Sequence, residues 1–315
     1  MLEINRFAVC GSGFIGKGLV HQLISQGYMV NVLDRNICPD EFSEKTKWVT
    51  SEFADSENLK NTLDDAEVAY HLISSTVPGD DTVDPIKELS ENIFSTIAFL
   101  EMCKKCNVKR VVFVSSSAVY GLQSTMPISE GAETNPISSH GIQKLTVEKY
   151  LLLYQFLYDI DIRIIRLSNP YGPGQSLSGR QGFIAIAIGN MIKNESVLLR
   201  DSGRPIRDFI YIDDVSRALA LAGIVENVPS ILNLGSGKGY SLKQIVELLE
   251  EITGNHVLTV AGELRKTDIT ESVLDISQAE RTLDFEPQFS IYDGLVKTLR
   301  YYDVQTPKIK PHNHN

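Results

Sequence analysis

Short apolar stretches alternate with amphipathic stretches along the first half of the chain. The run RFAVC (6–10) is followed by a helical pattern that stops at Gly27, and a second apolar run, YMVNVLD (28–34), comes next. A strand, a helix and a strand within about 30 residues form a βαβ unit, whose crossover is expected to be right-handed. The pattern therefore predicts a parallel sheet that starts near the N-terminus.

The same alternation continues to residue 168. It predicts further strands at WVT (48–50), VAYHLIS (68–74), KRVVFVSSS (109–117) and IRIIRLS (162–168), with helices at 56–64, 84–107 and 138–159. Apolar strands that alternate with amphipathic helices are typical of a doubly wound parallel sheet. We therefore expect an α/β fold with a Rossmann domain in residues 1–168.

The pattern changes after Asn169. Loop-rich stretches precede shorter helices and strands. Apolar runs occur again at RDFIYIDDV (207–215) and ILNLGSG (231–237). We expect a smaller α+β substrate-binding lobe in residues 169–300, with segments at about 207–235 returning to the first domain. The tail KIKPHNHN (308–315) is polar and lacks an apolar period, so we expect residues 301–315 to be mobile.

The composition narrows the class of protein. Of the 315 residues, 43% are hydrophobic and 22% charged, which is normal for a globular protein. The net charge of −10 argues against a nucleic-acid partner, because phosphate backbones attract basic surfaces. No apolar run reaches the length of a membrane span. Few thiols and no signal peptide predict a cytoplasmic location, and Cys103 with Cys106 lacks the second pair that a zinc site would need.

The sequence GSGFIG (11–16) matches the pattern G-x-G-x-x-G. The first glycine allows a tight turn, the second lets the backbone approach a pyrophosphate, and the third lets the helix pack on the sheet. The loop follows a predicted strand and opens a predicted helix, so phosphates would lie at the positive end of that helix. We expect a dinucleotide to contact Gly11, Ser12, Gly13, Phe14, Ile15 and Gly16.

Asp34 ends the second predicted strand, about twenty residues after the glycine loop. A carboxylate at this place can accept hydrogen bonds from both ribose hydroxyls and would repel a 2′-phosphate. Asp34 therefore predicts NAD rather than NADP as the cofactor. Arg35 follows directly and could weaken that preference.

Motifs occur in a fixed order over about residues 6–300. They are the glycine loop, HLIS (71–74), ENIFSTIAFLEMCKK (91–105), SSSAVYG (115–121), RLSNPYGPGQ (166–175), RDFIYIDDV (207–215) and NLGSGKGYSL (233–242). In these motifs the chain resembles the extended short-chain dehydrogenase/reductase family, in particular nucleotide-sugar epimerases of the UDP-glucose 4-epimerase type. The resemblance implies NAD, a nucleoside diphosphate sugar and hydride transfer at sugar C4. It also implies cofactor contacts by Asp55, Leu72, Ile73, Ser74, Asn92, Lys144 and Pro170.

Two features depart from the family pattern. The family loop usually reads G-x-x-G-x-x-G, with one more residue, so we expect pyrophosphate binding with altered local contacts. The family also has a Tyr-x-x-x-Lys pair. In SSHGIQK (138–144), His140 occupies the tyrosine position and Lys144 the lysine position. No lysine elsewhere in the chain has a tyrosine four residues before it, so the pair is not displaced to another place.

In the family, the tyrosine exchanges a proton with the sugar hydroxyl, while the lysine lowers the tyrosine pKa and binds the nicotinamide ribose. A serine or threonine hydroxyl completes the site, and its position here is Ser116, with Ser117 as the alternative. His140 has three interpretations. In the first, it is a working acid–base group. In the second, the protein binds NAD and a sugar nucleotide but catalyses poorly or not at all. In the third, the histidine replaces the tyrosine in a variant, which is natural or made to trap a substrate. In the first interpretation, Lys144 would push the pKa of the imidazole down, and the neutral imidazole could still accept the hydroxyl proton.

The resemblance also indicates the reaction. Family dehydratases carry Thr-Asp-Glu before V-Y-G, whereas this chain has Ser116, Ser117 and Ala118. We therefore expect 4-epimerisation or 4-keto reduction. Relatives form dimers through two helices of each subunit, which correspond to 84–107 and 138–159, so a homodimer is expected.

On the substrate side, Asn169, Arg207 and Arg265 match positions that bind the sugar nucleotide, the two arginines its diphosphate. Each arginine could instead be a surface residue paired with Asp208 or Asp268. Three further positions are of less weight: Arg180 as a pocket residue, and Asp213 with Asp214 as acids at a helix start.

Overall fold

The computed structural model describes residues 4–74, 85–179 and 181–306. The prediction for Arg180, and that for residues 307–315 of the expected tail 301–315, lie outside these residues. The strands are β1 (Arg6–Cys10), β2 (Met29–Asp34), β3 (Thr46–Thr50), β4 (Val68–His71), β5 (Arg110–Ser116), β6 (Asp161–Leu167), β7 (Asn169–Tyr171), β8 (Val197–Arg200), β9 (Ile206–Tyr211), β10 (Ile231–Leu234), β11 (Gly239–Ser241), β12 (Thr259–Gly262) and β13 (Glu271–Ser272).

The helices follow the predicted alternation. They are α1 (Phe14–Ser25), α2 (Ser56–Leu63), α3 (Pro85–Leu89), α4 (Ser95–Lys105), α5 (Ser139–Tyr158), α6 (Phe183–Lys193), α7 (Ile212–Ile224), α8 (Leu242–Thr253), α9 (Ser277–Leu283) and α10 (Ile291–Tyr301). A π-helical turn spans Ser90–Phe94, and short 3₁₀ turns cover Asp40–Phe42, Ser117–Tyr120 and Asp201–Gly203.

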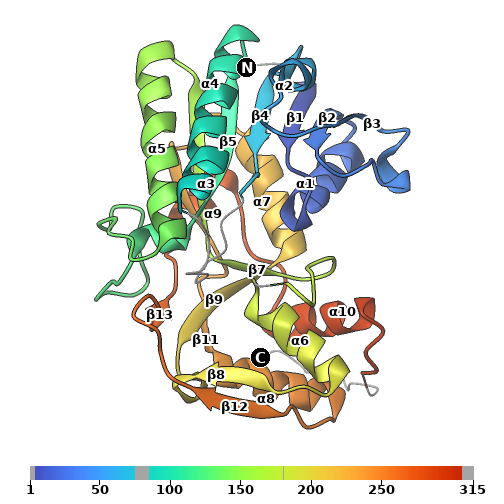
Figure 1. Ribbon diagram of the computed structural model, residues 1–315, viewed down its shortest axis with the longest axis vertical. Helices are drawn as coiled ribbons and strands as arrows, with labels where there is room; N and C mark the ends of the chain where they lie inside the picture. Colours follow the sequence, from blue (N-terminus) through green and yellow to red (C-terminus); the bar gives the residue numbers. More distant parts are fainter. Residues whose placement is uncertain (1–3, 75–84, 180, 307–315) are drawn as a thin grey trace.

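The main sheet is doubly wound. Within the described ranges, seven parallel strands follow the order β10-β6-β5-β4-β1-β2-β3. Successive side chains of a strand point to opposite faces. Phe7 and Val9 therefore join a core cluster with α1 and α7, whereas Ala8 and Cys10 join another with α2, α4 and α5. Figure 1 shows α4 and α5 on one side of the sheet and α1 with α7 on the other. The predicted α/β fold is confirmed.

The smaller lobe contains two short sheets. Strand β9 lies between β11 and β13 and also pairs with β7, while β8 pairs with β12. The segment 207–235 was expected to return to the first domain, and two of its three elements do so. Strand β10 pairs with β6, and helix α7 packs on α1. Strand β9 does not return, because its partners are strands of the smaller lobe.

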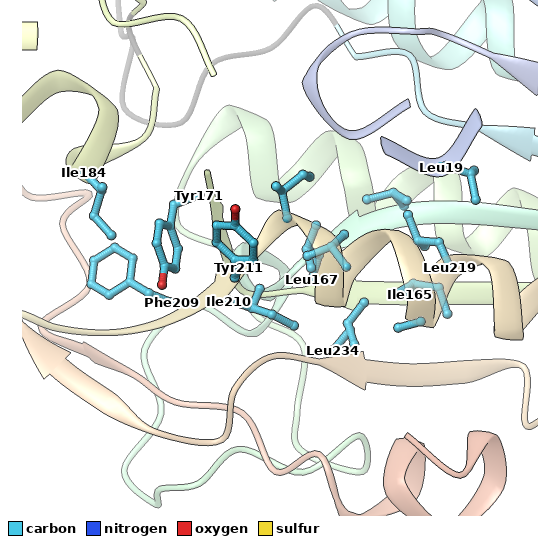
Figure 2. Packing of buried hydrophobic residues seen from close by; sticks show 14 of the residues in the cluster. Leu19, Ile165, Leu167, Tyr171, Ile184, Phe209, Ile210, Tyr211, Leu219 and Leu234 are labelled. Atoms are coloured by element: carbon cyan, nitrogen blue, oxygen red, sulfur yellow. The ribbon is translucent and has the colours of Figure 1, made fainter. Parts of the chain in front are cut away.

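One core connects the two lobes. Figure 2 shows Leu167 and Leu219 of the main sheet and its helix α7 in the same cluster as Tyr171, Phe209 and Ile184. Within it, the Tyr171 ring packs edge-to-face on Phe209 at a centroid distance of 6.4 Å. A shared core fixes the two lobes relative to each other, and the cavity between them has packed walls.

Two elements differ from the prediction. The expected helix 84–107 is interrupted by the π turn, where the hydroxyl of Thr96 donates to the carbonyl of Asn92 at 2.5 Å. A π turn inserts one residue into a segment that is otherwise α-helical, and the prediction of one continuous helix did not include it. The expected strand 68–74 ends at His71, because the apolar residues after it continue into a loop that packs on the glycine loop.

Candidate active site

A cavity of about 990 Å³ lies beyond the carboxyl ends of β1, β4, β5 and β6 and extends to the smaller lobe. The strand order reverses between β1 and β4, and such a switch point is where open α/β sheets bind ligands. Gly11 and Gly13 line one part of the cavity, and Arg207 and Arg265 line another. The same cavity is lined by Ser116, His140 and Lys144.

The glycine loop has the geometry of a phosphate cradle. Gly11 has a φ of +99°, which favours glycine, and a Cβ on Gly16 would lie 2.0 Å from the Gly11 carbonyl oxygen. Gly13 is the N-cap of α1, no side chain caps the helix there, and a Cβ on Gly13 would meet nothing within 4 Å. The first N–H groups of α1 therefore face open space, which fits the pyrophosphate of a dinucleotide.

Asp34 connects β2 with the glycine loop. Its carboxylate accepts a hydrogen bond from the Ser12 N–H at 2.6 Å and two from Asn36, both at 2.8 Å. Asp34 is buried, whereas Arg35 beside it is exposed. The carboxylate thus fixes the loop, and its contact with a ribose stays a prediction.

The other expected cofactor contacts fall into three groups. Leu72 and Ser74 line the cavity, and Ile73 lies under the loop, 2.8 Å from where a Cβ on Gly11 would be. Asp55 lies outside the cavity, where its carboxylate caps α2 by accepting the N–H groups of residues 57 and 58 at 3.0 and 3.1 Å. Asn92 lies in the π turn, behind the cavity wall.

Helix α5 carries two titratable groups of the cavity wall, His140 and Lys144. His140 and Lys144 are four residues apart, so they lie on one face of the helix, and each is 8% exposed. The helix approaches the turn after β5 closely, because a Cβ on Gly141 would lie 2.6 Å from the Ala118 carbonyl oxygen. This close approach brings the first turn of α5 to the segment that carries Ser116.

Lys144 is held in the floor of the cavity. Its ammonium donates to the Val114 carbonyl at 2.8 Å and lies 4.6 Å from the centre of the Phe113 ring. Burial lowers the pKa of Lys144 to about 8, and the carboxylate of Glu148 opposes this shift. Lys144 therefore titrates close to the pH at which enzymes work.

His140 is a weak base in this environment. Burial, and secondly the charge of Lys144, lower the pKa of His140 to about 3. The imidazole is neutral at ordinary pH, when it can accept one hydrogen bond and donate another. Ser116 lies nearby in the cavity wall, where its hydroxyl oxygen accepts the Ala118 N–H at 3.2 Å.

Three guanidinium groups and one carboxylate line the part of the cavity that lies away from the glycine loop. Arg265 donates to Asp268 at 2.6 and 3.0 Å, and the Nε atom of Arg200 lies 3.9 Å from the same carboxylate. Burial lowers the pKa of Arg207, and the charge of Asp268 opposes this shift. All four side chains line the cavity, and their charges leave an excess of positive charge there.

The alternative pairings proposed for the two arginines have different outcomes. Arg265 is paired with Asp268, as that alternative predicted. Asp208 does not pair with Arg207: it is fully buried and accepts N–H groups of residues 236, 237 and 274 at 2.7 to 3.3 Å. Adjacent residues of a strand point to opposite faces. Because Asp208 faces the interior, Arg207 faces the cavity.

Sequence reasoning missed several residues of the cavity wall. Arg200 is one, and three more carry buried polar atoms with no hydrogen-bond partner among the described residues: the hydroxyls of Ser168 and Thr267 and the amide oxygen of Gln175. Buried polar atoms without a partner are rare, so these atoms are candidates for ligand contacts. Two of them, Ser168 and Gln175, had a signal in the sequence, because both lie in the RLSNPYGPGQ motif (166–175). Asn169 and Pro170, which were predicted, also line the cavity.

Other charged groups have structural roles. Asp213 and Asp214 begin α7, and the carboxylate of Asp214 accepts the N–H groups of Gln288 and Phe289 at 2.9 to 3.1 Å. Over the described ranges, no three or more His, Cys, Asp or Glu residues are grouped to hold a metal ion. Among the described helices, none has the length and apolar character needed to cross a membrane.

The Rossmann sheet, the uncapped glycine loop and the cavity with its guanidinium cluster define a dinucleotide-dependent enzyme. Residues 9–235 match the NAD dependent epimerase/dehydratase family. The putative UDP-glucose 4-epimerase of Methanocaldococcus jannaschii is 31% identical over 295 residues, which cover 92% of this chain and 96% of that protein. The chain therefore belongs to the NAD dependent epimerase/dehydratase family.

Solved structures agree with this assignment. UDP-glucose 4-epimerase of Thermotoga maritima, in complex with UDP-glucose, has a TM-score of 0.88 and 32% identity over 95% of this chain and 98% of that one. MoeE5 in complex with UDP-glucuronic acid and NAD has a TM-score of 0.86 and 30% identity over 95% and 99% of the two chains. The predicted enzyme class, an NAD-dependent nucleotide-sugar epimerase or 4-keto reductase, and the predicted cofactor, NAD, are confirmed.

Proposed function

We propose that this protein is a 4-epimerase of nucleoside diphosphate hexoses, with UDP-glucose and its C4 epimer as the first substrates to test. One observation carries the proposal: a single cavity is lined by the uncapped start of α1, by His140 and Lys144, and by the guanidinium cluster. The distribution of charge in this cavity suits two diphosphates at opposite ends, that of NAD at the glycine loop and that of a sugar nucleotide at the three arginines, with the sugar between them.

The residues of the glycine loop fit NAD. Gly11 and Gly13 would leave room for its pyrophosphate, and Asp34 would accept its ribose hydroxyls. When bound, NAD supplies the hydride exchange with C4 of the sugar. Arg207 and Arg265, with Arg200 beside them, would hold the diphosphate of the sugar nucleotide.

We propose that the proton of the sugar 4-hydroxyl is taken by Lys144 through His140. The neutral amine of Lys144 is a far better base than the imidazole, because the two pKa values are about 8 and about 3. His140 would accept the hydroxyl's hydrogen bond on one ring nitrogen and donate from the other. Ser116 would add a hydrogen bond to the sugar oxygen. In this arrangement His140 relays the proton and Lys144 stores it.

The change His140→Tyr tests this arrangement. We expect it to raise kcat at neutral pH about tenfold or more, because the Lys144 ammonium would draw the pKa of the phenol toward the working range. The measurement is the rate at which UDP-glucose and its C4 epimer interconvert, determined by chromatographic separation of the two. His140→Phe, which keeps an aromatic ring without titratable nitrogens, is the matched control and should lower kcat. If the tyrosine variant is slower than the wild type, the imidazole is itself the working acid–base group.

We also propose that the protein works in the cytoplasm, because Cys10, Cys38, Cys103 and Cys106 are all free thiols.

A homodimer through α4 and α5 is the second part of the proposal. The two helices lie side by side, and the Tyr154 hydroxyl of α5 donates to Glu101 of α4 at 2.5 Å. Along α5, exposed apolar side chains recur at helical spacing, and Phe156 is 83% exposed. On the neighbouring α3 and π turn, Ile86 and Phe94 are 77% and 66% exposed. Large exposed apolar side chains on α5 and on the adjacent segment from α3 to the π turn support a subunit interface.

The change Phe156→Glu should break the dimer. Burial of one phenylalanine contributes about 2 kcal/mol, and a two-fold interface contains it twice, so we expect a loss of about 4 kcal/mol of association free energy. Light scattering during gel filtration should give twice 35.0 kDa for the wild type and 35.0 kDa for the variant. Val260→Glu on β12, also at an exposed apolar residue, is the control. Dimers that persist in the Phe156 variant would contradict this interface.

A further inference from the structure

The first turns of α5 present two different faces. His140 and Lys144 form one pair four residues apart, and they line the cavity. Ser139 and Gln143 form the adjacent pair, each one residue earlier, and Gln143 is only 4% exposed. Whatever holds the second pair fixes the direction in which the first pair points, because the helix is rigid over one turn.

The second pair is held by a carboxylate from another helix. The same oxygen of Glu88 accepts a hydrogen bond from the Ser139 hydroxyl at 2.8 Å and another from the Gln143 amide nitrogen at 2.7 Å. Glu88 belongs to α3 and is 4% exposed. The first turn of α5 contains no acidic residue of its own, and the positive end of a helix favours a negative charge. Glu88 thus supplies that charge from outside the helix.

The π turn completes the network. The amide nitrogen of Asn92 donates to the Gln143 amide oxygen at 2.9 Å and to the Glu88 carbonyl at 2.9 Å. Both ends of the Gln143 amide are therefore engaged, its nitrogen by Glu88 and its oxygen by Asn92. A carboxylate and two amides in a buried network leave little freedom for the turn of α5 that they contact.

We propose that Glu88 is a positioning residue for catalysis: through Ser139 and Gln143 it sets the orientation of the helix turn that carries His140 and Lys144. This inference rests on the proposed function, because it concerns the same site. Glu88 itself does not line the cavity and touches neither substrate nor cofactor in this account. Its carboxylate acts by accepting two hydrogen bonds, which an alanine cannot do and a glutamine can do with its amide oxygen.

The test compares Glu88→Ala, Glu88→Gln and the control Glu91→Ala, whose surface carboxylate pairs with Lys87 at 3.6 Å. For Glu88→Ala we expect kcat to fall about 10-fold to 100-fold, since a small misplacement of reacting groups costs this much. KM and NAD retention should stay within about twofold of the wild type. Glu88→Gln should recover most of the loss, and Glu91→Ala should behave as the wild type. Hydrogen exchange at residues 139–147 should become faster in Glu88→Ala alone.

Two results would overturn the inference. One is an unchanged kcat in Glu88→Ala. The other is an equal loss in both Glu88 variants, or a parallel loss of NAD retention, either of which would indicate general damage to the fold. If the wild type converts no sugar nucleotide, the proposed function fails by itself. Hydrogen exchange then decides the positioning role: faster exchange in Glu88→Ala than in Glu91→Ala supports it, and equal exchange contradicts it.

Discussion

Replacing Lys144 by methionine should lower kcat about a thousandfold, the range in which removal of a general acid–base group falls. Lys144 is buried in the cavity floor, and its pKa of about 8 makes it the group best matched to proton transfer at ordinary pH. His140 would remain, but its pKa of about 3 makes it a poor proton acceptor by itself. The measurement is the rate of interconversion of UDP-glucose and its C4 epimer.

The pH dependence gives this prediction its sign. Below about pH 8 Lys144 carries its proton, and above that pH it is a neutral amine that can accept one. The rate of the wild type should therefore rise as the pH increases through about 8, and the methionine variant should lack this rise. Lys144→Arg keeps the charge but stays protonated, so it should be as slow as the methionine variant.

Controls separate catalysis from folding. Lys149→Met changes an exposed lysine on the same helix and should leave the rate unchanged. The thermal midpoint of Lys144→Met should not fall, because the change removes a buried charge whose burial is unfavourable. Full activity in Lys144→Arg would show that the charge matters and the proton transfer does not.

The second large effect is expected at Gly13. A Cβ at this position meets nothing within 4 Å, and its φ of −73° suits any residue, so Gly13→Asp should fold. The new carboxylate would occupy the N-cap of α1 and accept the N–H groups that face the open space. It would also repel a pyrophosphate. We expect the Kd for NAD to rise at least about 100-fold, or about 2.7 kcal/mol.

Stability and affinity should move separately in this variant. Aspartate is at least as good an N-cap as glycine, so the thermal midpoint should be unchanged or higher. Calorimetric titration with NAD and a melting curve measure the two effects. Gly13→Ala adds a methyl group without charge and should cause a smaller loss, while Gly131→Asp adds the same charge at an exposed glycine. Retention of NAD by Gly13→Asp would contradict the role of the α1 N-terminus.

The strands were predictable because parallel strands buried on both faces are continuous apolar runs. RFAVC and KRVVFVSSS became β1 and β5 within one residue at each end. The π turn was not predicted, because it is a local change of backbone hydrogen bonding within a segment that stays helical from Pro85 to Lys105. Its consequence is large, because it brings Asn92 to Gln143 of α5.

The residues of the candidate site also fall into those that the sequence predicted and those that it did not. Gly11, Gly13, His140 and Lys144 were predicted because local motifs define them, and they line one cavity. Arg200 and Thr267 enter the cavity from segments that meet only in the folded chain, so no local spacing indicates them. Glu88 is of a residue type that is mostly exposed, and its burial depends on packing against α5. Tertiary contacts, which the sequence pattern does not contain, decide such positions.

The most direct test is to incubate the purified protein with NAD and UDP-glucose, and separately with NAD and the C4 epimer of UDP-glucose, at a pH above 8. Proton NMR of the sugar nucleotides then shows whether the two mixtures change. We predict that both mixtures reach the same equilibrium composition with no net consumption of NAD. Two mixtures that stay unchanged, in a protein that calorimetry shows to bind neither NAD nor a nucleoside diphosphate hexose, would contradict it.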